Sequence, residues 1–406
     1  MDTPSRIRAA VNCVPEFAGY GEKEFFVEPL RGGLTNLLWM VGLKNSKNQD
    51  VSAKSPTSSS TSSSSNTNPS SNSLGSNSGS GTDTDDDATP QQGKRSRKDP
   101  RPTTIALVRE YGRGTESFMN RLQEERIVQR LCEEGLCPTV YGVYPWGRVE
   151  RYLSDSRTLS TTEYASPEYL PKVARLLGQF HAHSSSLTPL CTDTGKDSRL
   201  GHRLYQWFKI ASSVRFEGDD PEDRRKHRKL EALDLNNSVK TEIEWFLKEV
   251  SEVKSPVVFC HCDLQEGNVL LHGNQLHMID FEYSDRLERG FDFGNCFCEM
   301  AIDYQVNSYP GFIVYPDSFP DEAKQIAFLR AYADGAGLEF NEGTERQLLR
   351  EANLFIMGSH LHWAIWSVVQ GGNSTIDFGY MEYAEQRMDQ YYFFKRRVWP
   401  NMKSAV

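Results

Sequence analysis

Residues 268–283 read NVLLHGNQLHMIDFEY, and this segment constrains the fold more than any other part of the chain. Two apolar runs flank the dipeptide Gly273-Asn274, which is a strong short-range signal for a β-hairpin with a two-residue turn. Counting outward from that turn places Asn268 and Asp280 at the same open end of the hairpin. Paired strands then hold the two residues roughly 5 Å apart.

The loop before this hairpin carries a second carboxylate. It reads FCHCDLQEGN, with Asp263 placed five residues before Asn268. Mg²⁺ takes oxygen ligands and needs few from the protein, which suits Asn268 and Asp280. Asp263 is placed to accept a hydroxyl proton. An Asp base with an Asn and a second Asp that hold the metal matches the catalytic groups of protein kinases, so the pattern predicts phosphoryl transfer.

The first strands are predicted to carry the groups that meet a nucleotide. Residues 24–44 alternate well enough for two strands joined by a Gly-Gly turn, where backbone amides can approach phosphates. Arg109, on a third predicted strand, is placed to offer a cation to those phosphates. A helix is predicted over residues 116–134, and Glu124, with Glu125 next to it, is the expected ion-pair partner that orients Arg109.

The remaining elements complete an α+β arrangement. Two strands are predicted over residues 139–153, and helical periodicity recurs over segments 171–183, 235–250, 321–335, 345–369 and 381–395. The sequence therefore predicts a bilobal, protein-kinase-like fold. Its amino-terminal, nucleotide-binding lobe covers residues 1–153 and contains a small β-sheet. Its larger, mainly helical carboxy-terminal lobe covers residues 154–406 and carries catalysis and substrate binding.

An insert of about residues 45–100 interrupts the first lobe between two strands. It consists mainly of Ser, Asn, Thr and Gly, and such a segment cannot bury enough apolar surface to order itself, so we expect it to be disordered. The net charge of −9 argues against a general nucleic-acid binder. The basic run 94–101 is interpreted as a solvated end of the insert, with a nuclear-import signal or a patch for an acidic partner as the alternative.

Nothing in the chain predicts a targeting or membrane segment. The first residues, MDTPSRIRAAVNCVPEF, lack the apolar core of a signal peptide. No uninterrupted apolar stretch approaches the roughly 18 residues that span a bilayer. The eight cysteines lack zinc-ribbon spacing. We expect a cytoplasmic protein with free thiols.

The motifs CHCDLQEGNVLL, IDFEYSDRLERGFDFGNCFCE and HLHWAIWSVVQ with FGYMEYA resemble those of choline kinases, within the choline/ethanolamine kinase family. The resemblance covers nearly the whole chain outside the insert. It implies a protein-kinase-like fold and phosphorylation of choline by ATP and Mg²⁺, the first step of the CDP-choline route to phosphatidylcholine. The members of this family are usually homodimers.

The resemblance also implies a set of nucleotide-binding residues. Gln265 lies beside the nucleotide and the metal, and Arg109 contacts the phosphates. A phosphate-covering loop and an adenine-binding hinge fall, respectively, on Arg31, Gly32, Gly33, Leu34, Thr35, Asn36 and Leu37, and on Arg151, Tyr152, Leu153, Ser154, Asp155, Ser156 and Arg157.

Choline constrains its pocket because its trimethylammonium group has no N–H donors. Aromatic faces can hold it, each contributing about 0.5–2 kcal/mol by cation–π attraction, together with a carboxylate. Trp363 and Trp366 share one helix face, although that spacing alone is more typical of core packing. The resemblance places the choline site on both, with Glu299 as the countercharge and with Tyr283, Tyr304, Phe378 and Tyr383. The aromatic content favours choline, and an ethanolamine or dual kinase is the alternative.

Cys262 departs from the family pattern, which usually has Asn before the catalytic Asp. Loss of one or two loop hydrogen bonds, at about 0.5–1.5 kcal/mol each, predicts a several-fold to about hundredfold effect on the rate. We interpret Cys262 as a tuning change. The alternative is a catalytically weak, choline-binding scaffold that acts through the Ser-rich insert.

Overall fold

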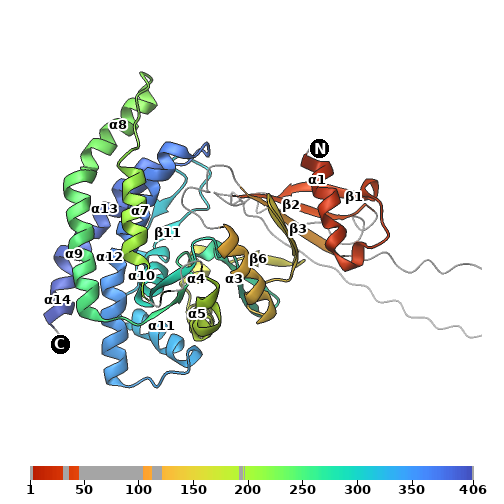
Figure 1. Ribbon diagram of the computed structural model, residues 1–406. Helices are drawn as coiled ribbons and strands as arrows, with labels where there is room; N and C mark the ends of the chain where they lie inside the picture. The colour runs from red at the N-terminus through yellow and green to blue at the C-terminus, as the bar shows by residue number, and fades with distance from the viewer. Residues whose placement is uncertain are drawn as a thin grey trace, which may run out of the picture.

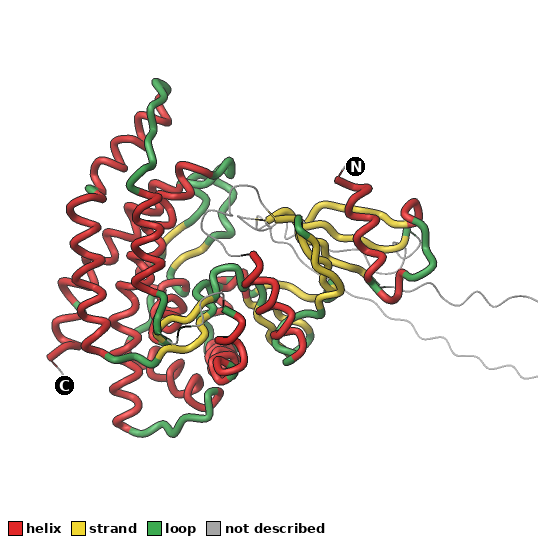
Figure 2. Tube along the Cα trace, viewed as in Figure 1, coloured by secondary structure: helices red, strands yellow, loops and turns green. Residues whose placement is uncertain are grey.

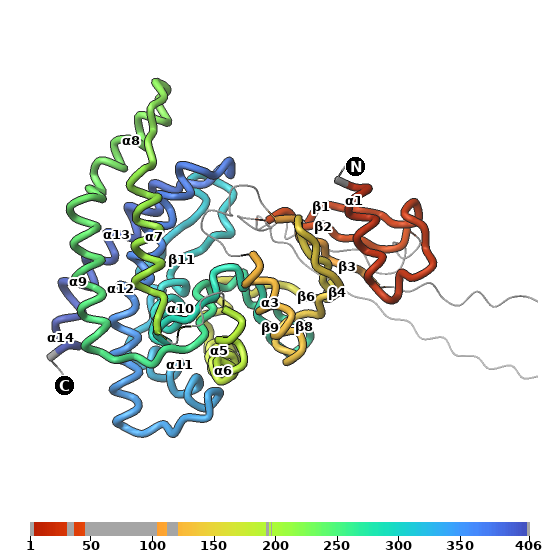
Figure 3. Tube along the Cα trace, viewed as in Figure 1, coloured from red at the N-terminus to blue at the C-terminus, as the bar shows by residue number. Residues whose placement is uncertain are grey.

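The computed structural model describes residues 3–30, 36–44, 104–111, 121–191, 195 and 197–404. These residues form a small part built on a sheet and a larger, mainly helical part, which lie at opposite sides of the view in Figure 1. The amino terminus lies beside the sheet and the carboxy terminus at the far edge of the helical part (Figure 3). The predicted insert and residues 31–35 of the predicted phosphate loop lie outside the described residues.

A five-stranded antiparallel sheet forms the smaller part, in the order β1-β2-β3-β5-β4. The strands predicted on either side of the Gly-Gly dipeptide are present and pair with each other. The third strand pairs with the second, although the insert separates the two along the chain. The strands are β1 (Phe25–Leu30), β2 (Asn36–Leu43), β3 (Ile105–Tyr111), β4 (Val140–Tyr144) and β5 (Gly147–Arg151).

The two parts have separate hydrophobic cores. Helix α1 (Thr3–Ala10) and the turns after it pack on the sheet, around Ile7, Phe17, Phe25, Val41 and Val149. Helix α3 (Arg121–Glu133) follows the third strand along the chain, yet its buried apolar residues belong to the core of the helical part: Ile127, Val128 and Leu131. The helix therefore connects the sheet to the larger part, and Figure 3 shows it between them.

A long buried helix organises the larger part. Helix α12 (Glu342–Asn373) begins where the Asn341 side chain accepts the backbone N–H of Thr344, and residues 351–370 are all buried. Around it lie α5 (Leu170–Ala182), α7 (Leu200–Ala211), α8 (Pro221–Leu233), α9 (Lys240–Val253), α10 (Gly290–Glu299), α11 (Glu322–Gly335), α13 (Tyr380–Arg397) and α14 (Trp399–Ser404). Two shorter helices are α4 (Thr161–Tyr164) and α6 (Ser184–Leu187).

The six predicted helices are present, the one over 116–134 within its described residues, whereas α7, α8 and α10 are among the helices that were not predicted. Helix α8 buries no residue, so it has no apolar stripe. Its start was still readable, because Asp220 caps two backbone N–H groups just before Pro221. Helix α10 is buried along its whole length and therefore lacks the polar face that marks a surface helix. None of the helices among the described residues is long and apolar enough for a bilayer.

Short strands connect the two parts, as the yellow segments near the centre of Figure 2 show. A three-stranded sheet joins β6 (Ser156–Thr158) to the hairpin of β8 (Val269–His272) and β9 (Gln275–Met278). Strand β7 (Val257–Cys260) pairs with β10 (Asp285–Glu288), and β11 (Ile302–Asp303) with β12 (Ile313–Val314). The loop between β7 and β8 covers residues 261–268, HCDLQEGN, and thus most of the segment FCHCDLQEGN.

Candidate active site

The predicted hairpin and its register are confirmed. Strands β8 and β9 pair with the turn at Gly273-Asn274, and Gly273 has a φ of +57°, which glycine adopts without strain. The carbonyl of Asn268 accepts the backbone N–H of Ile279 at 3.1 Å, so the pairing extends to the open end. Asn268 and Asp280 both lie at that end.

Asp263 lies on the loop that leads into the hairpin, and Asn268 holds it there. The Asn268 side-chain amide donates to the Asp263 carbonyl at 2.7 Å and to its carboxylate at 3.0 Å. Burial raises the pKa of Asp263 well above its usual value, and nearby carboxylates, Glu299 first, raise it further. A cation bound close to Asp263 would therefore favour the ionised form, which can accept a proton.

Asp280 has one oxygen that is paired and one that is not. Its Oδ2 accepts from Arg109 Nη1 at 3.3 Å. Its Oδ1 is buried and has no hydrogen-bond partner within the described part of the chain. An uncompensated buried carboxylate oxygen is costly, and a bound cation would satisfy it.

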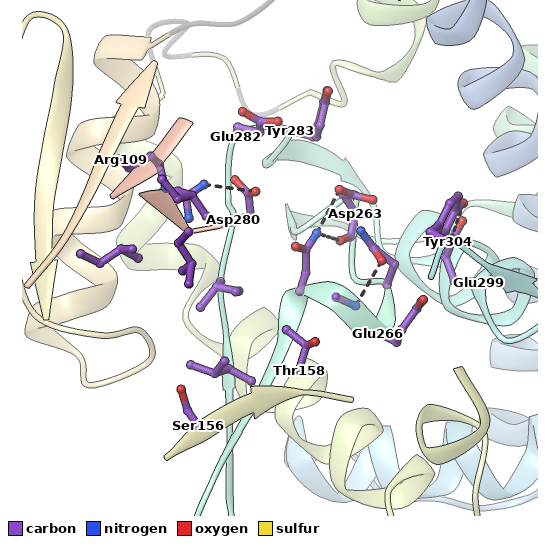
Figure 4. A pocket seen from close by; sticks show the side chains of 18 of the residues that line it. Arg109, Ser156, Thr158, Asp263, Glu266, Asp280, Glu282, Tyr283, Glu299 and Tyr304 are labelled. Carbon is purple, nitrogen blue, oxygen red and sulfur yellow. Dashed lines mark hydrogen bonds and ion pairs between the residues drawn. The ribbon is translucent and has the colours of Figure 1, made fainter. Parts of the chain in front are cut away.

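A cavity of about 690 Å³ brings the predicted catalytic residues together. Asp263, Gln265, Asn268 and Asp280 all line it. In Figure 4, Asp263 lies between Asp280, which faces Arg109, and the pair formed by Glu299 and Tyr304. One cavity thus has two differently built ends, with Asp263 between them.

The loop that carries Asp263 rests on a buried carboxylate that the sequence analysis did not single out. Asp292 accepts the backbone N–H groups of His261 at 2.8 Å and Cys262 at 2.7 Å, and it contacts His181 Nε2 at 2.9 Å. The first two contacts fix the backbone just before Asp263, and the contact with His181 holds the Asp292 carboxylate in place. Asp292 lies in the GFDFGN part of a motif that carries the family resemblance, so the motif could have marked it as a site residue. The spacing alone does not specify its partners.

The predicted ion pair between Arg109 and Glu124 was wrong. Within the described residues, Arg109 contacts Asp280 and also Glu150, at 3.6 Å from its Nε. Glu124 instead pairs with Arg148 and, at 2.8 Å, with Arg121. Arg148 lies opposite Arg109 on the neighbouring strand, and it forms the ion pair with Glu124 that was expected for Arg109.

The end of the cavity that contains Arg109 is lined by apolar and hinge residues. Of the predicted hinge, Arg151, Tyr152, Leu153 and Ser156 line it, whereas Ser154, Asp155 and Arg157 do not. The Arg157 side chain instead forms an ion pair with Glu163, at 2.6 Å. A further group of residues lines the cavity here and was not predicted: Leu30, Leu38, Leu107, Pro138, Glu150, Thr158, Leu270 and Ile279.

Three predicted nucleotide residues lie away from the cavity wall. Asn36 is buried, and its side-chain amide donates to Glu282 at 3.2 Å. Leu37 is 59% exposed on β2. Glu124 is buried behind Arg148. Arg31, Gly32, Gly33, Leu34 and Thr35 lie outside the described residues.

The other end of the cavity is aromatic. All seven residues predicted there line it: Tyr283, Glu299, Tyr304, Trp363, Trp366, Phe378 and Tyr383. Trp363 stands edge to face against both Tyr283 and Trp366, with ring centroids 5.2 Å apart in each pair. Gln305, Glu266 and Gly311 also line this cavity and were not predicted.

The polar atoms of the aromatic wall are already used by the protein. The indole N–H of Trp363 donates to Asn295 at 2.7 Å, and that of Trp366 donates to the hydroxyl of Tyr283 at 2.9 Å. With those donors satisfied, the rings contribute mainly their faces and edges to a ligand.

Glu299 is the carboxylate of this end. It accepts from the Tyr304 hydroxyl at 2.8 Å and pairs with Arg387, which is 1% exposed and also donates to Tyr383. Arg387 was not predicted, because an arginine in a helix with many charged residues has no pattern that marks it as buried. Its guanidinium fixes the orientation of the Glu299 carboxylate.

Comparisons with known proteins agree with this arrangement. Residues 92–392 match the family described as Choline/ethanolamine kinase. The Homo sapiens protein named choline/ethanolamine kinase is 33% identical over 298 residues, which cover 71% of this chain and 71% of that protein.

Solved structures of similar proteins share the fold. A choline kinase from Cryptosporidium parvum has a TM-score of 0.69 at 21% identity, over 98% of this chain and 96% of that chain. The Plasmodium vivax ethanolamine kinase has a TM-score of 0.69 at 21% identity, over 97% of this chain and 89% of that chain. The fold is therefore protein-kinase-like, as predicted. The family match spans most of the sequence, and the chain is a kinase that belongs to the choline/ethanolamine kinase family.

Proposed function

We propose that this kinase transfers the γ-phosphate of ATP to the hydroxyl group of choline and forms phosphocholine. One observation carries the proposal: Asp263 lies in a single cavity between Asp280 with Arg109 on one side and Glu299 with Tyr304 on the other (Figure 4). A phosphate donor at the first end and a cationic alcohol at the second would meet beside Asp263.

Asp263 is assigned as the general base. It accepts the hydroxyl proton of the alcohol as the oxygen attacks the γ-phosphate. Asn268 holds the Asp263 carboxylate in place through its amide. The raised pKa of Asp263 suits a base that must take up a proton and release it again.

Asn268 and Asp280 are assigned as the residues that hold Mg²⁺. Asp280 Oδ1 is buried without a hydrogen-bond partner within the described residues, and the hydrogen bonds of the Asn268 side chain to Asp263 both use its amide nitrogen. Two oxygen donors fit the ligand preference of this ion. When bound, the ion supplies positive charge that stabilises the transferring phosphoryl group.

ATP is assigned to the end of the cavity that contains Arg109. The side chains of Leu38, Leu107 and Leu270 offer apolar surface for adenine, next to the hinge at Tyr152. Arg109 contacts the phosphates in this proposal, and Gln265 lies beside the nucleotide and the metal. The lobe over residues 1–153 thus binds nucleotide, and residues 154–406 bind the acceptor and carry out catalysis.

Choline is assigned to the aromatic end. Trp363, Trp366 and Tyr383 surround its trimethylammonium group, and Glu299 supplies the negative charge. Each aromatic face contributes about 0.5–2 kcal/mol, and hydrogen bonds are not required. Phosphocholine formation is the first step of the CDP-choline route to phosphatidylcholine. That the enzyme is cytoplasmic and forms a homodimer stays a prediction.

Ethanolamine is the second candidate acceptor, and Glu266 favours it. This carboxylic acid lines the cavity and is 1% exposed. Its Oε1 accepts from Thr161 at 3.2 Å, while its Oε2 has no hydrogen-bond partner within the described residues. A free acceptor suits the three N–H donors of a primary ammonium group, which choline lacks.

An assay with ATP labelled in the γ-phosphate tests both acceptors in parallel. We expect transfer to choline with the higher kcat/KM, and transfer to ethanolamine with a lower one. Asp263→Ala should reduce both by several orders of magnitude, whereas Asp389→Ala, the same change at an exposed site on α13, should leave both intact. Equal product from wild type and Asp263→Ala would sink the proposal.

A further inference from the structure

A group of buried charges lies between the sheet and helix α3, behind the phosphate end of the cavity. Its members come from four separate segments of the chain. We call it the buried charge network, and it consists of Arg109, Arg121, Glu124, Arg148, Glu150, Asp280 and Glu282. Two of its members, Arg109 and Asp280, are nucleotide-side residues of the proposed function.

The network begins with two arginines that should repel each other. Arg109 on β3 and Arg148 on β5 are direct cross-strand partners, and both side chains are almost fully buried. Like charges opposite each other destabilise a sheet. Glu150 offsets this, because it pairs with Arg148 and also lies 3.6 Å from Arg109 Nε. Glu150 therefore fixes the position of one arginine relative to the other.

Glu124 supplies the second carboxylate and attaches the network to the larger part. It accepts from Arg148 and, at 2.8 Å, from Arg121. On the same helix, Ile127 and Leu131 pack in the hydrophobic core of the larger part. Burial alone would raise the pKa of Glu124, but the two arginines more than offset it and keep the pKa below its ordinary value.

A second branch leads from Glu124 back to the catalytic hairpin. Arg121 donates to Glu282 at 3.3 Å, and Glu282 lies two residues after Asp280, which Arg109 contacts at 3.3 Å. The contacts thus form a closed ring from Glu124 through both branches to the segment 280–282. A shift of Glu124 would disturb both branches at once.

We propose that Glu124 is a positioning residue for phosphoryl transfer: through Arg148 and Glu150 it sets Arg109, and through Arg121 and Glu282 it sets the segment that carries Asp280. It does so without lining the cavity. This inference rests on the proposed function. The sequence predicted a direct contact between Glu124 and Arg109. In the structure Glu124 contacts Arg148 instead, and Glu150 joins Arg148 to Arg109.

The neighbouring glutamate offers a matched control for the test. Glu125 is half-buried on the same helix and accepts from the Tyr111 hydroxyl at 3.3 Å. The Tyr111 ring lies 4.7 Å from the Arg121 guanidinium, so Glu125 touches the buried charge network through a neutral side chain, whereas Glu124 is part of its ion pairs. Glu124→Gln and Glu125→Gln are the same chemical change one residue apart. For each variant, kcat, the KM values for ATP and choline, and the choline Kd without nucleotide should be measured, the last by titration calorimetry.

Glu124→Gln is expected to lower kcat/KM for ATP by about tenfold to hundredfold, because small displacements at the phosphate end are costly. The choline Kd should stay within about twofold of wild type, because Glu124 reaches the aromatic end only indirectly, through Arg121 and Glu282, which precedes Tyr283. Glu124→Asp, which keeps the charge, should recover part of the loss. Glu125→Gln should match wild type in every measurement.

Two results would overturn the inference. One is a folded Glu124→Gln variant with kcat/KM for ATP within about twofold of wild type; the other is an equal loss of choline binding and ATP use, which would indicate a general structural role. If Glu124→Gln does not fold, Arg148→Lys serves instead, because lysine keeps the positive charge but cannot bind Glu124 and Glu150 at once through a planar guanidinium. We again expect a lower kcat/KM for ATP with a choline Kd close to that of wild type. A wild-type protein without transfer to either alcohol would sink the proposed function itself, which the same assay reveals separately.

Discussion

Replacing Cys262 with asparagine is expected to stabilise the folded protein and raise its activity. Cys262 is fully buried next to Asp263, and its φ of +70° lies in the left-handed region. Most residues with a Cβ lose about 1–2 kcal/mol there, whereas asparagine adopts this conformation several times more often than average. The backbone therefore favours asparagine at this position.

The surroundings of Cys262 favour a carboxamide as well. Arg203 donates to Asp285 at 3.1 Å from Nη2, while its Nη1 is buried without a hydrogen-bond partner within the described residues. Burial raises the pKa of the Cys262 thiol, and Arg203 beside it opposes that shift. An asparagine oxygen could accept from Nη1, and hydrogen bonds to charged groups contribute about 1.5–3 kcal/mol. Desolvation of the amide offsets part of this, so we expect a net gain of about 1–3 kcal/mol.

Urea unfolding and steady-state kinetics of wild type, Cys262→Asn and Cys262→Ser measure this effect. Serine is the matched control, because it has the size of cysteine but not the reach of asparagine. We expect Cys262→Asn to unfold at higher urea and to have a several-fold higher kcat/KM for choline. A Cys262→Asn variant no more stable than Cys262→Ser would refute the reasoning. Turnover of wild type equal to that of Cys262→Asn would remove the main support for a catalytically weak scaffold.

Three further changes test other parts of the structure. Trp366→Ala should lower kcat/KM for choline by about tenfold and that for ethanolamine by less, because the aromatic face contributes about 0.5–2 kcal/mol to the quaternary cation; equal losses for both alcohols would contradict this. Burial holds the pKa of His360 and of His362 well below the ordinary value, so both bind protons only after unfolding. The free energy of unfolding should thus fall as the pH drops below about 6.5, by up to about 1.4 kcal/mol per histidine for each pH unit. In the His362→Leu variant, the urea midpoint should change less steeply with pH than in wild type. A Cβ at Gly294 would lie 2.2 Å from a backbone carbon of α12, so Gly294→Ala should cost about 1–3 kcal/mol in urea unfolding, whereas Gly201→Ala, with 3.5 Å to its nearest neighbour, should not.

The hairpin was predictable because its determinants are local. A Gly-Asn turn with alternating strands fixes the register by itself, so the sequence placed Asn268 and Asp280 at one end. The aromatic end depended on the family resemblance instead. Spacing put Trp363 and Trp366 on one face, but nothing in the spacing tells a ligand pocket from a core, and both rings are in fact nearly buried.

The ion pairs were not predictable, because they depend on packing between segments far apart in sequence. Glu124 was expected to meet Arg109, yet it forms its ion pair with Arg148 on the neighbouring strand. Arg387 and Asp292 act on the site from helices whose side chains had no pattern pointing to these partners. Long-range geometry decides which buried carboxylate meets which arginine, and a single sequence does not record it.

A crystal structure with Mg²⁺, choline and a non-hydrolysable ATP analogue would show directly whether Asp263 meets the acceptor beside the metal. We expect the ion on oxygens of Asn268 and Asp280, the choline hydroxyl within hydrogen-bond distance of Asp263, and the trimethylammonium group against Trp363 and Trp366. An ion bound elsewhere, or a choline whose hydroxyl faces away from Asp263, would contradict it.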